Sequence, residues 1–341
     1  MNLGMDLGSS QVVICGTSGV LLEEPAVIAV DRKSGHMIAC GAEAEPMLDR
    51  TPPSILAVRP VKNGTIAEYD LTEKMLRHFL RRVCSDRILK PRVAVSITEN
   101  ITEVERRSFI ESVFSAGARR VTLVPETVAS AIGMGLDVGL PRGQMVVNAG
   151  AGTVDAAVLS LRGTAVSNSM KLAGQAVDEA IIRYIHNEHN LVISPTAAQR
   201  VKIGIGHVMP YGFDARMTVK GRDAVTGLPR AREVTSIEIG ETIQDALLPL
   251  TDLISQVLES TPPELSGDIL HDGIHLCGGL AQLRGLPEWI ERQLGIRCHT
   301  ASEPRRCVAL GAAMALQYAS SFSEIYDLSD FSYRLSDSVA E

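Results

Sequence analysis

Two short stretches of the sequence place a turn of small residues directly after an acidic or amide side chain. In "GMDLGSSQVVI" (4–14) an apolar segment ends at Asp6, and in "VVNAGAGTVDAAV" (146–158) a similar segment ends at Asn148. Small residues let an anion approach backbone N–H groups closely, and hydroxyl side chains add donors. Either turn alone is typical of any tight hairpin, but two in matching positions favour a pair of phosphate-binding loops. The predicted loop residues are Gly8, Ser9, Ser10 and Gln11 in the first turn and Gly150, Ala151, Gly152 and Thr153 in the second.

Two further glycine turns could hold the rest of a phosphorylated ligand. Gly278 and Gly279 follow an apolar segment in "GIHLCGGLAQLRGL" (273–286), and Gly174 precedes a predicted helix in "KLAGQAVDEAI" (171–181). A strand that passes through a glycine turn into a helix is a suitable seat for a nucleoside or a phosphate. An ordinary strand-to-helix loop explains the same pattern, and the sequence leaves both interpretations open.

The elements that must position these turns alternate along the chain. The apolar patterns predict strands at 92–97 and 120–124 and amphipathic helices at 70–85 and 101–118. Thr102 and Glu105 have the spacing of a capping box at the start of the last helix. This order predicts an α/β fold in which mixed, largely parallel sheets are flanked by helices.

The repeated hairpin also bears on domain organisation. Its two copies lie about 140 residues apart by subtraction of Asp6 from Asn148, and the 341 residues suffice for two domains. We therefore expect two similar domains that face each other, with a small ligand in the cleft between them. The segment 319–341 is rich in serine and acidic residues, which predicts a mobile tail whose aromatic residues could dock.

The bulk composition excludes several classes of protein. Hydrophobic residues make up 45% and charged residues 21% of the chain, with a net charge of −7, so the composition is that of a soluble protein that does not bind nucleic acid in bulk. The six cysteines form no Cys-x-x-Cys pair, which argues against a zinc site or a disulfide framework and favours a reducing cytoplasm. No membrane-spanning helix and no secretory signal is expected.

Other candidate sites have simpler explanations. The pairs His186/His189 and His271/His275 have metal-like spacing, but neither has a third ligand nearby, so structural or solvent roles are favoured. The pair Arg305-Arg306 predicts a surface patch, and Trp289 in an amphipathic helix predicts a core residue.

Several longer motifs resemble the actin, heat-shock chaperone and sugar kinase superfamily, and within it the MreB family of bacterial actins. They are "EEPAVIAVDRKSG" (23–35), "VRPVKNGTIAEYDLTEKMLRHF" (58–79), "PRVAVSITENITEVERR" (91–107), "DEAIIRYI" (178–185), "VTGLP" (225–229) and "LESTPPELSGDILHDGIHLCGGLAQLRGL" (258–286). The resemblance extends over roughly residues 3–316 and leaves the tail uncovered.

The resemblance implies an actin-like fold of two lobes. Lobe I would comprise residues 1–138, with a small insertion at about 31–65, and would receive a C-terminal helix at about 303–320. Lobe II would comprise 139–318, with an inserted subdomain at about 183–242, followed by the tail 319–341.

The resemblance also implies ATP or ADP with Mg²⁺ in the cleft. By this resemblance the carboxylate of Asp6 would hold Mg²⁺ through water. Glu126 would position the attacking water, and Asn148 would be the third catalytic residue. The nucleoside would be held by Gly174, Gln199, Lys202, Gly278, Gly279 and Leu280.

This sequence departs from the family pattern at the expected site. Asn148 stands where the second phosphate loop usually begins with Asp, and Gln199 stands where a glutamate is usual. Mg²⁺ favours carboxylate oxygens, so Asn148 should weaken the ordering of metal and water more than the phosphate contacts. We therefore expect nucleotide binding with slow hydrolysis.

The function that the resemblance implies is that of a cytoskeletal protein. The chain would assemble with itself into filaments at the inner leaflet of the cytoplasmic membrane, and these would organise cell shape and wall synthesis with partner proteins. Ile88 and Leu89 lie within "RRVCSDRILKPR" (81–92), where two apolar residues in a basic ring could insert shallowly into an anionic membrane or pack under their own helix. Two alternatives remain, a non-polymerising nucleotide-binding regulator of such filaments and a small-molecule kinase or ATPase of the same fold.

Overall fold

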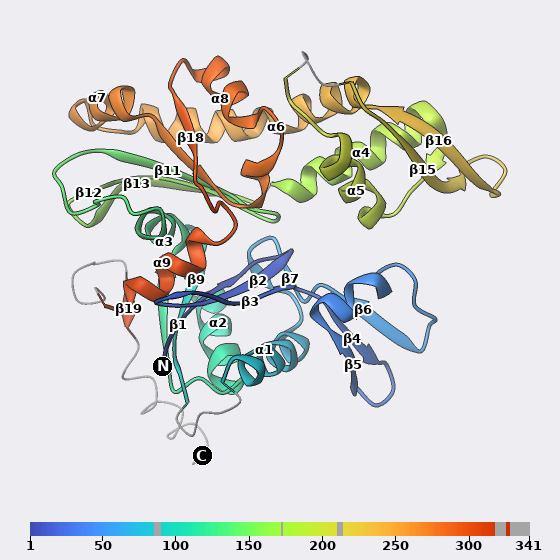
Figure 1. The fold of residues 1–341 in the computed structure, drawn as a ribbon, viewed down its shortest axis with the longest axis horizontal. Coiled ribbons are helices and arrows are strands. Elements are labelled where there is room, and N and C mark those ends of the chain that lie inside the picture. Colours follow the sequence, from blue (N-terminus) through green and yellow to red (C-terminus); the bar gives the residue numbers. More distant parts are fainter. Residues whose placement is uncertain (85–89, 172, 210–213, 318–324, 328–341) are drawn as a thin grey trace.

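The computed structural model describes residues 1–84, 90–171, 173–209, 214–317 and 325–327. Two lobes, each built around one sheet, lie one above the other in Figure 1. The sheet of lobe I has the order β19-β10-β9-β1-β2-β3, with β1 (Asn2–Leu7), β2 (Gln11–Gly16), β3 (Gly19–Pro25), β9 (Arg92–Ile97), β10 (Arg120–Pro125) and β19 (Tyr326–Asp327). The sheet of lobe II has the order β13-β12-β11-β17-β18, with β11 (Gln144–Ala149), β12 (Val154–Ser160), β13 (Gly163–Met170), β17 (Ile274–Cys277) and β18 (Cys298–Thr300).

Both sheets are mixed, and their two halves differ in strand direction. Parallel pairing joins β1 to β9 and β9 to β10 in lobe I, and β11 to β17 and β17 to β18 in lobe II. The remaining pairs, including the hairpins β1–β2 and β11–β12, are antiparallel. Fewer of the neighbouring strands are therefore parallel than the alternation of strands and helices in the sequence indicated. The reason is that each predicted phosphate loop connects two antiparallel strands of a hairpin.

Helices cover the faces of both sheets. Lobe I carries α1 (Tyr69–Cys84), α2 (Glu103–Ser115) and α3 (Glu126–Gly133); lobe II carries α4 (Gly174–His189), α5 (Pro195–Ile205), α6 (Ser236–Glu259), α7 (Pro263–Asp272) and α8 (Leu286–Leu294). The capping box predicted for Thr102 and Glu105 is present at the start of α2. The helix buries Phe109 and Val113, whereas Val104 is 76% exposed and Phe114 41% exposed, so its apolar stripe is narrower than the sequence suggested.

Each lobe also carries a small outer sheet at the same side of the molecule (Figure 1). In lobe I this sheet has the order β5-β4-β6, with β4 (Ile28–Asp31), β5 (Met37–Cys40) and β6 (Ile55–Val58), followed by the short hairpin β7 (Val61–Lys62) and β8 (Thr65–Ile66). In lobe II it has the order β14-β15-β16, with β14 (Leu191–Val192), β15 (Arg216–Asp223) and β16 (Pro229–Thr235).

The last described helix, α9 (Cys307–Ala315), follows lobe II in the chain but packs on lobe I. A Cβ atom at Gly4 of β1 would lie 2.1 Å from the Ala309 carbonyl oxygen, and one at Gly311 would lie 1.7 Å from the Ala129 carbonyl oxygen. The glycines thus allow α9 to pack directly against β1 and α3, which places its first turn beside the space between the lobes.

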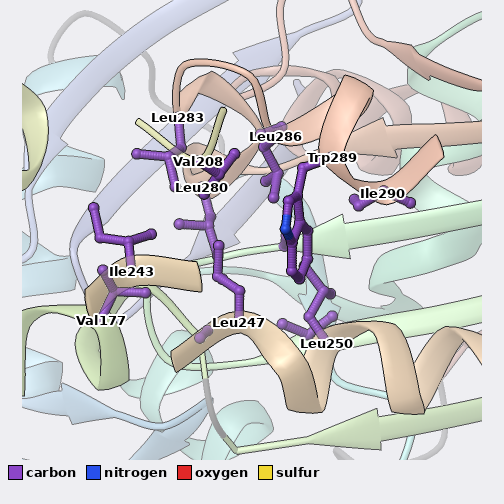
Figure 2. Close-up of a cluster of buried hydrophobic side chains, with 14 of the residues drawn as sticks. Val177, Val208, Ile243, Leu247, Leu250, Leu280, Leu283, Leu286, Trp289 and Ile290 are labelled. Carbon is purple, nitrogen blue, oxygen red and sulfur yellow. The ribbon is translucent and has the colours of Figure 1, made fainter. Parts of the chain in front are cut away.

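The core of lobe II contains the single tryptophan. Trp289 is 3% exposed and packs with Leu247 and Leu250 of α6 and Leu286 of its own helix (Figure 2). The prediction that Trp289 is a core residue is therefore confirmed.

Part of the segment expected to be a mobile tail belongs to the fold. Tyr326 pairs with Leu123 and Asp327 with Thr122, so β19 extends the sheet of lobe I, and Ile325 is buried. For residues 325–327 the segment is therefore not a mobile tail, and the alternative that one of its aromatic residues docks holds for Tyr326, which pairs with the edge of the sheet at β10. Residues 318–324 and 328–341 lie outside the described residues.

Candidate functional site

The two glycine turns predicted from the sequence have the same backbone geometry. Gly8 N–H donates to the Gln11 carbonyl at 3.0 Å, and Gly150 N–H donates to the Thr153 carbonyl at 2.9 Å. A Cβ at Gly8 would lie 3.0 Å from that Gln11 oxygen, and one at Gly150 would lie 3.2 Å from the Thr153 oxygen. Glycine is therefore favoured at both positions because the turns close tightly.

Both turns open into one cavity of about 480 Å³ between the lobes. This cavity collects every nucleotide and catalytic candidate proposed from the sequence. They are Asp6, Gly8, Ser9, Ser10, Gln11, Glu126, Asn148, Gly150, Ala151, Gly152, Thr153, Gly174, Gln199, Lys202, Gly278, Gly279 and Leu280. Residues from six separate regions of the chain thus meet at one site, because each lobe presents its hairpin turn to the other.

Two half-buried carboxyl groups, those of Asp6 and Glu126, line the cavity. Burial raises the pKa of Asp6 to about 6, although Ser96 Oγ donates to its Oδ1 at 3.2 Å. Burial, and then the carboxylates of Asp155 and Asp6, raise the pKa of Glu126 well above its ordinary value. A cation at this position would release the protons that these groups otherwise hold.

Asn148 has a defined orientation beside these groups. Its Nδ2 donates to Glu126 Oε2 at 2.5 Å, and its Oδ1 accepts a contact from Cys277 Sγ at 3.5 Å. The side chain is 4% exposed. The Asn148 amide therefore donates a hydrogen bond to Glu126, whereas an Asp at this position would place a second carboxyl group against that of Glu126.

The residues of the cavity could supply Mg²⁺ with only a few of the oxygen ligands that it needs. Asp6 and Glu126 offer carboxylates to the cavity, and hydrated Mg²⁺ is typically held by one or two carboxylates together with substrate phosphates. Among the described residues, no group of three or more His, Cys, Asp or Glu side chains is arranged to hold a metal by itself. The site therefore suits a metal ion that enters together with a phosphate chain. The ion would neutralise negative charge on the phosphates.

Asp155 is a buried carboxylate that the sequence did not single out. It lies opposite Asn148 in the β11–β12 register and is 0% exposed. Its Oδ1 accepts from Thr98 Oγ1 at 2.5 Å and from Glu99 N–H at 2.9 Å, just beyond β9 of lobe I. Asp155 thus ties the second hairpin to the other lobe, and burial raises its pKa.

Lobe II forms the side of the cavity that was predicted from the sequence to hold a nucleoside. Lys202 Nζ donates to the Gly174 carbonyl at 2.7 Å and pairs with Asp178 at 2.9 Å. Gly278 has φ +88°, and a Cβ there would lie 2.2 Å from the Ala149 carbonyl oxygen.

The glycine turn after β17 leads into a short 3-10 helix, Gly279–Gln282, and α8 begins only at Leu286. The α-helix therefore starts several residues later than the sequence predicted. Leu280 points into the core of lobe II in Figure 2.

Two arginines contact the first predicted phosphate loop, and neither contact was predicted from the sequence. Arg59 Nη1 donates to the Ser10 carbonyl at 2.7 Å. Arg305 Nη2 donates to Gln11 Oε1 and pairs with Glu23 at 2.9 Å. The Arg305 and Arg306 side chains are 35% and 44% exposed, as expected of a surface pair, but Arg305 also lines the cavity. Its contact with Gln11 joins residues 294 positions apart, which no local pattern reveals.

Two further sets of contacts join parts of the two lobes, one at the cavity and one outside it. Gly64 N–H donates to Ser9 Oγ at 3.3 Å, and a Cβ at Gly64 would lie 2.6 Å from Thr153 Cγ2, so this turn fits between the two phosphate-loop candidates. Farther out, Thr196 near the start of α5 donates to Asp49 Oδ2 at 3.0 Å and joins the outer parts of the lobes.

The remaining candidates lie elsewhere. His189 approaches Glu238 at 3.6 Å, and His271 contacts Asp272 at 2.7 Å, so neither histidine pair converges on a shared ion. Ile88 and Leu89 lie outside the described residues. No helix in the described part of the chain is long and apolar enough to cross a membrane.

Comparisons with known proteins agree with this geometry. The model of the MreB/Mbl protein family matches residues 1–324. The chain is 38% identical to the cell shape-determining protein Mbl of Bacillus subtilis over 92% of its length and 95% of that protein, and 40% identical to the cell shape-determining protein MreB of Escherichia coli over 93% of each. The crystal structure of MreB5 of Spiroplasma citri bound to ADP matches with a TM-score of 0.88 and 32% identity, covering 93% of this chain and 96% of that one. The chain belongs to the MreB/Mbl family of actin-like proteins.

Proposed function

We propose that this protein binds ATP and ADP between its lobes. The observation that carries the proposal is that two matching phosphate-loop turns and a glycine-lined nucleoside seat face one cavity. The matched MreB5 structure is described as bound to ADP, which supports the same use of this cavity here. Titration of the purified protein with a fluorescent ADP in Mg²⁺ tests the proposal, and absence of saturable binding would refute it.

Hydrolysis in this chain is slow, on our proposal, because Asn148 replaces a carboxylate at the metal side of the cavity. The amide holds Glu126 Oε2 directly, so the group proposed to position water is engaged by a neutral donor. Asp6 is then the main candidate for holding Mg²⁺, which would neutralise charge on the phosphate chain. Phosphate release should rise in Asn148→Asp, and an unchanged rate would contradict this account.

The cellular role that follows is that of a filament-forming cytoskeletal protein involved in cell shape. Family membership and the names of the matched relatives, which are cell shape-determining proteins, support this role. Self-assembly at the inner face of the cytoplasmic membrane, with Ile88 and Leu89 as the anchor, is the further part of the proposal. Electron microscopy with ATP, with and without anionic vesicles, tests both parts, and a matched Ile88→Ser, Leu89→Ser variant tests the anchor.

One alternative has an observation in its favour. The Asn148–Glu126 contact suits a protein that holds nucleotide without turning it over, as a non-polymerising regulator of filaments would. Absence of filaments under every nucleotide and lipid condition, together with tight nucleotide binding, would favour this regulator. Sugar-dependent ADP production would instead favour a kinase.

A further inference from the structure

Two adjacent arginines share one carboxylate where the chain returns from lobe II to lobe I. Arg305 Nη2 lies 2.9 Å from Glu23 Oε1, and Arg306 Nε lies 2.8 Å from Glu23 Oε2. Arg305 lines the cavity that holds the phosphate-loop turns. Arg306 lines a separate cavity of about 430 Å³ and also pairs with Glu303 at 3.0 Å. The two side chains therefore have the same charge and a common partner but face different spaces.

The same short segment touches both sides of the nucleotide site. Arg305 donates to the side chain of Gln11 in the first phosphate loop, and the carbonyl of Pro304 accepts from Gly278 N–H at 2.7 Å. The guanidinium of Arg305 is thus fixed beside the phosphate loop of lobe I while its neighbour holds the nucleoside turn of lobe II.

The other cations that line the cavity are engaged by lobe II. Among the described residues the lining cations are Lys202, Arg284 and Arg305. Lys202 contacts Asp178 and the Gly174 carbonyl, and Arg284 donates to the carbonyls of Ile203 and Gly206 at 3.2 and 3.3 Å. Arg305 instead contacts Gln11 of the first predicted phosphate loop.

We propose that Arg305 donates directly to the phosphate chain of the bound nucleotide and positions Gln11 for the same task. This inference rests on the proposed binding of ATP and ADP. The two contacts of Arg305 use at most two of the five N–H donors of a guanidinium, so donors remain for phosphate oxygens. Glu23 also pairs with Arg306 at 2.8 Å, so it keeps a cationic partner even where the ligand takes a share of the Arg305 donors.

The test compares Arg305→Gln with the matched control Arg306→Gln. Both variants remove one positive charge next to Glu23, but only the first removes it from the cavity. We expect Arg305→Gln to weaken ATP and ADP about tenfold, the size of one charge-assisted contact, and to change adenosine less than about twofold. Arg306→Gln should leave all three affinities within about twofold. Displacement of a fluorescent ADP in Mg²⁺ gives each dissociation constant.

Three outcomes would overturn the proposal: unchanged ATP affinity in Arg305→Gln, an equal loss for adenosine, or an equal loss of ATP in Arg306→Gln. The second would indicate a purely structural role, and the third a general effect of net charge. If Arg305→Gln does not fold, Glu23→Gln decides the matter. It leaves Arg305 in the cavity, so the proposal predicts equal or tighter ATP binding, whereas a structural ion pair predicts weaker binding. A wild type that binds no adenine nucleotide refutes the proposed function instead.

Discussion

Replacement of Asn148 by Asp should destabilise the nucleotide-free protein and make it more responsive to Mg²⁺. The amide nitrogen lies 2.5 Å from Glu126 Oε2, and the side chain is almost fully buried. The substitution removes the hydrogen bond that the amide donates to Glu126 and places a second ionisable carboxyl group against it, a loss of about 1.5–3 kcal/mol at a pH where the pair ionises. A chain of this size changes its melting temperature by about 2 °C per kcal/mol, so a decrease of about 3–6 °C is expected without ligand.

The pH dependence of this effect has a definite sign. Two neighbouring carboxyl groups retain a proton more strongly when folded, so their folded pKa lies above the unfolded one. The pair is therefore tolerated at low pH, and the destabilisation grows as pH rises through the folded pKa. Melting at pH 6 and pH 8.5 in EDTA should show a larger deficit of Asn148→Asp, relative to the wild type, at the higher pH.

The matched control for this prediction is Asn148→Ala, which loses the hydrogen bond without adding a charge. Mg²⁺ with ATP should recover the melting temperature of Asn148→Asp more than that of Asn148→Ala, because only the carboxylate offers a hard oxygen to the ion. Equal melting curves for the two variants in both EDTA and Mg²⁺-ATP would refute the reasoning that Asn148 sets the charge of this site.

Three further predictions concern other parts of the molecule. Asp49→Ala should raise the dissociation rate of a fluorescent ADP about two- to fivefold in stopped flow, because it removes the contact with Thr196 that joins the outer parts of the lobes. Arg50→Ala is the control, and the double variant Asp49→Ala, Thr196→Val should dissociate ADP no faster than Asp49→Ala alone. Burial raises the pKa of Asp6 from 3.8 to about 6, so the wild type loses the stabilising contribution of this group as pH rises. Without ligand, the melting temperature of Asp6→Asn minus that of the wild type should therefore increase between about pH 4 and pH 7. A difference that does not change with pH would contradict the raised pKa. Trp289→Ala should lower the free energy of unfolding by about 3–5 kcal/mol in urea titration, since it leaves a cavity among Leu247, Leu250 and Leu286, and a loss below 1 kcal/mol would contradict its place in the core.

Features built from neighbouring residues could be predicted from the sequence. The capping box of Thr102 and Glu105 lies within one turn of helix, and each phosphate-loop turn is closed by a bond between residues three apart. Such structures depend on local backbone geometry and on small side chains, and both are visible in a short stretch of sequence.

The arrangement of the whole site depended on contacts that no local pattern encodes. Asp155 reaches Thr98 across 57 positions, and Arg305 reaches Gln11 across 294, so their roles appear only when the lobes pack together. The same applies to β19, which pairs with β10 because a sheet edge was open to it. The sequence alone determined the two turns that suit phosphate; the tertiary structure decided which buried charges face them, because charge and burial depend on every element that packs around the cavity.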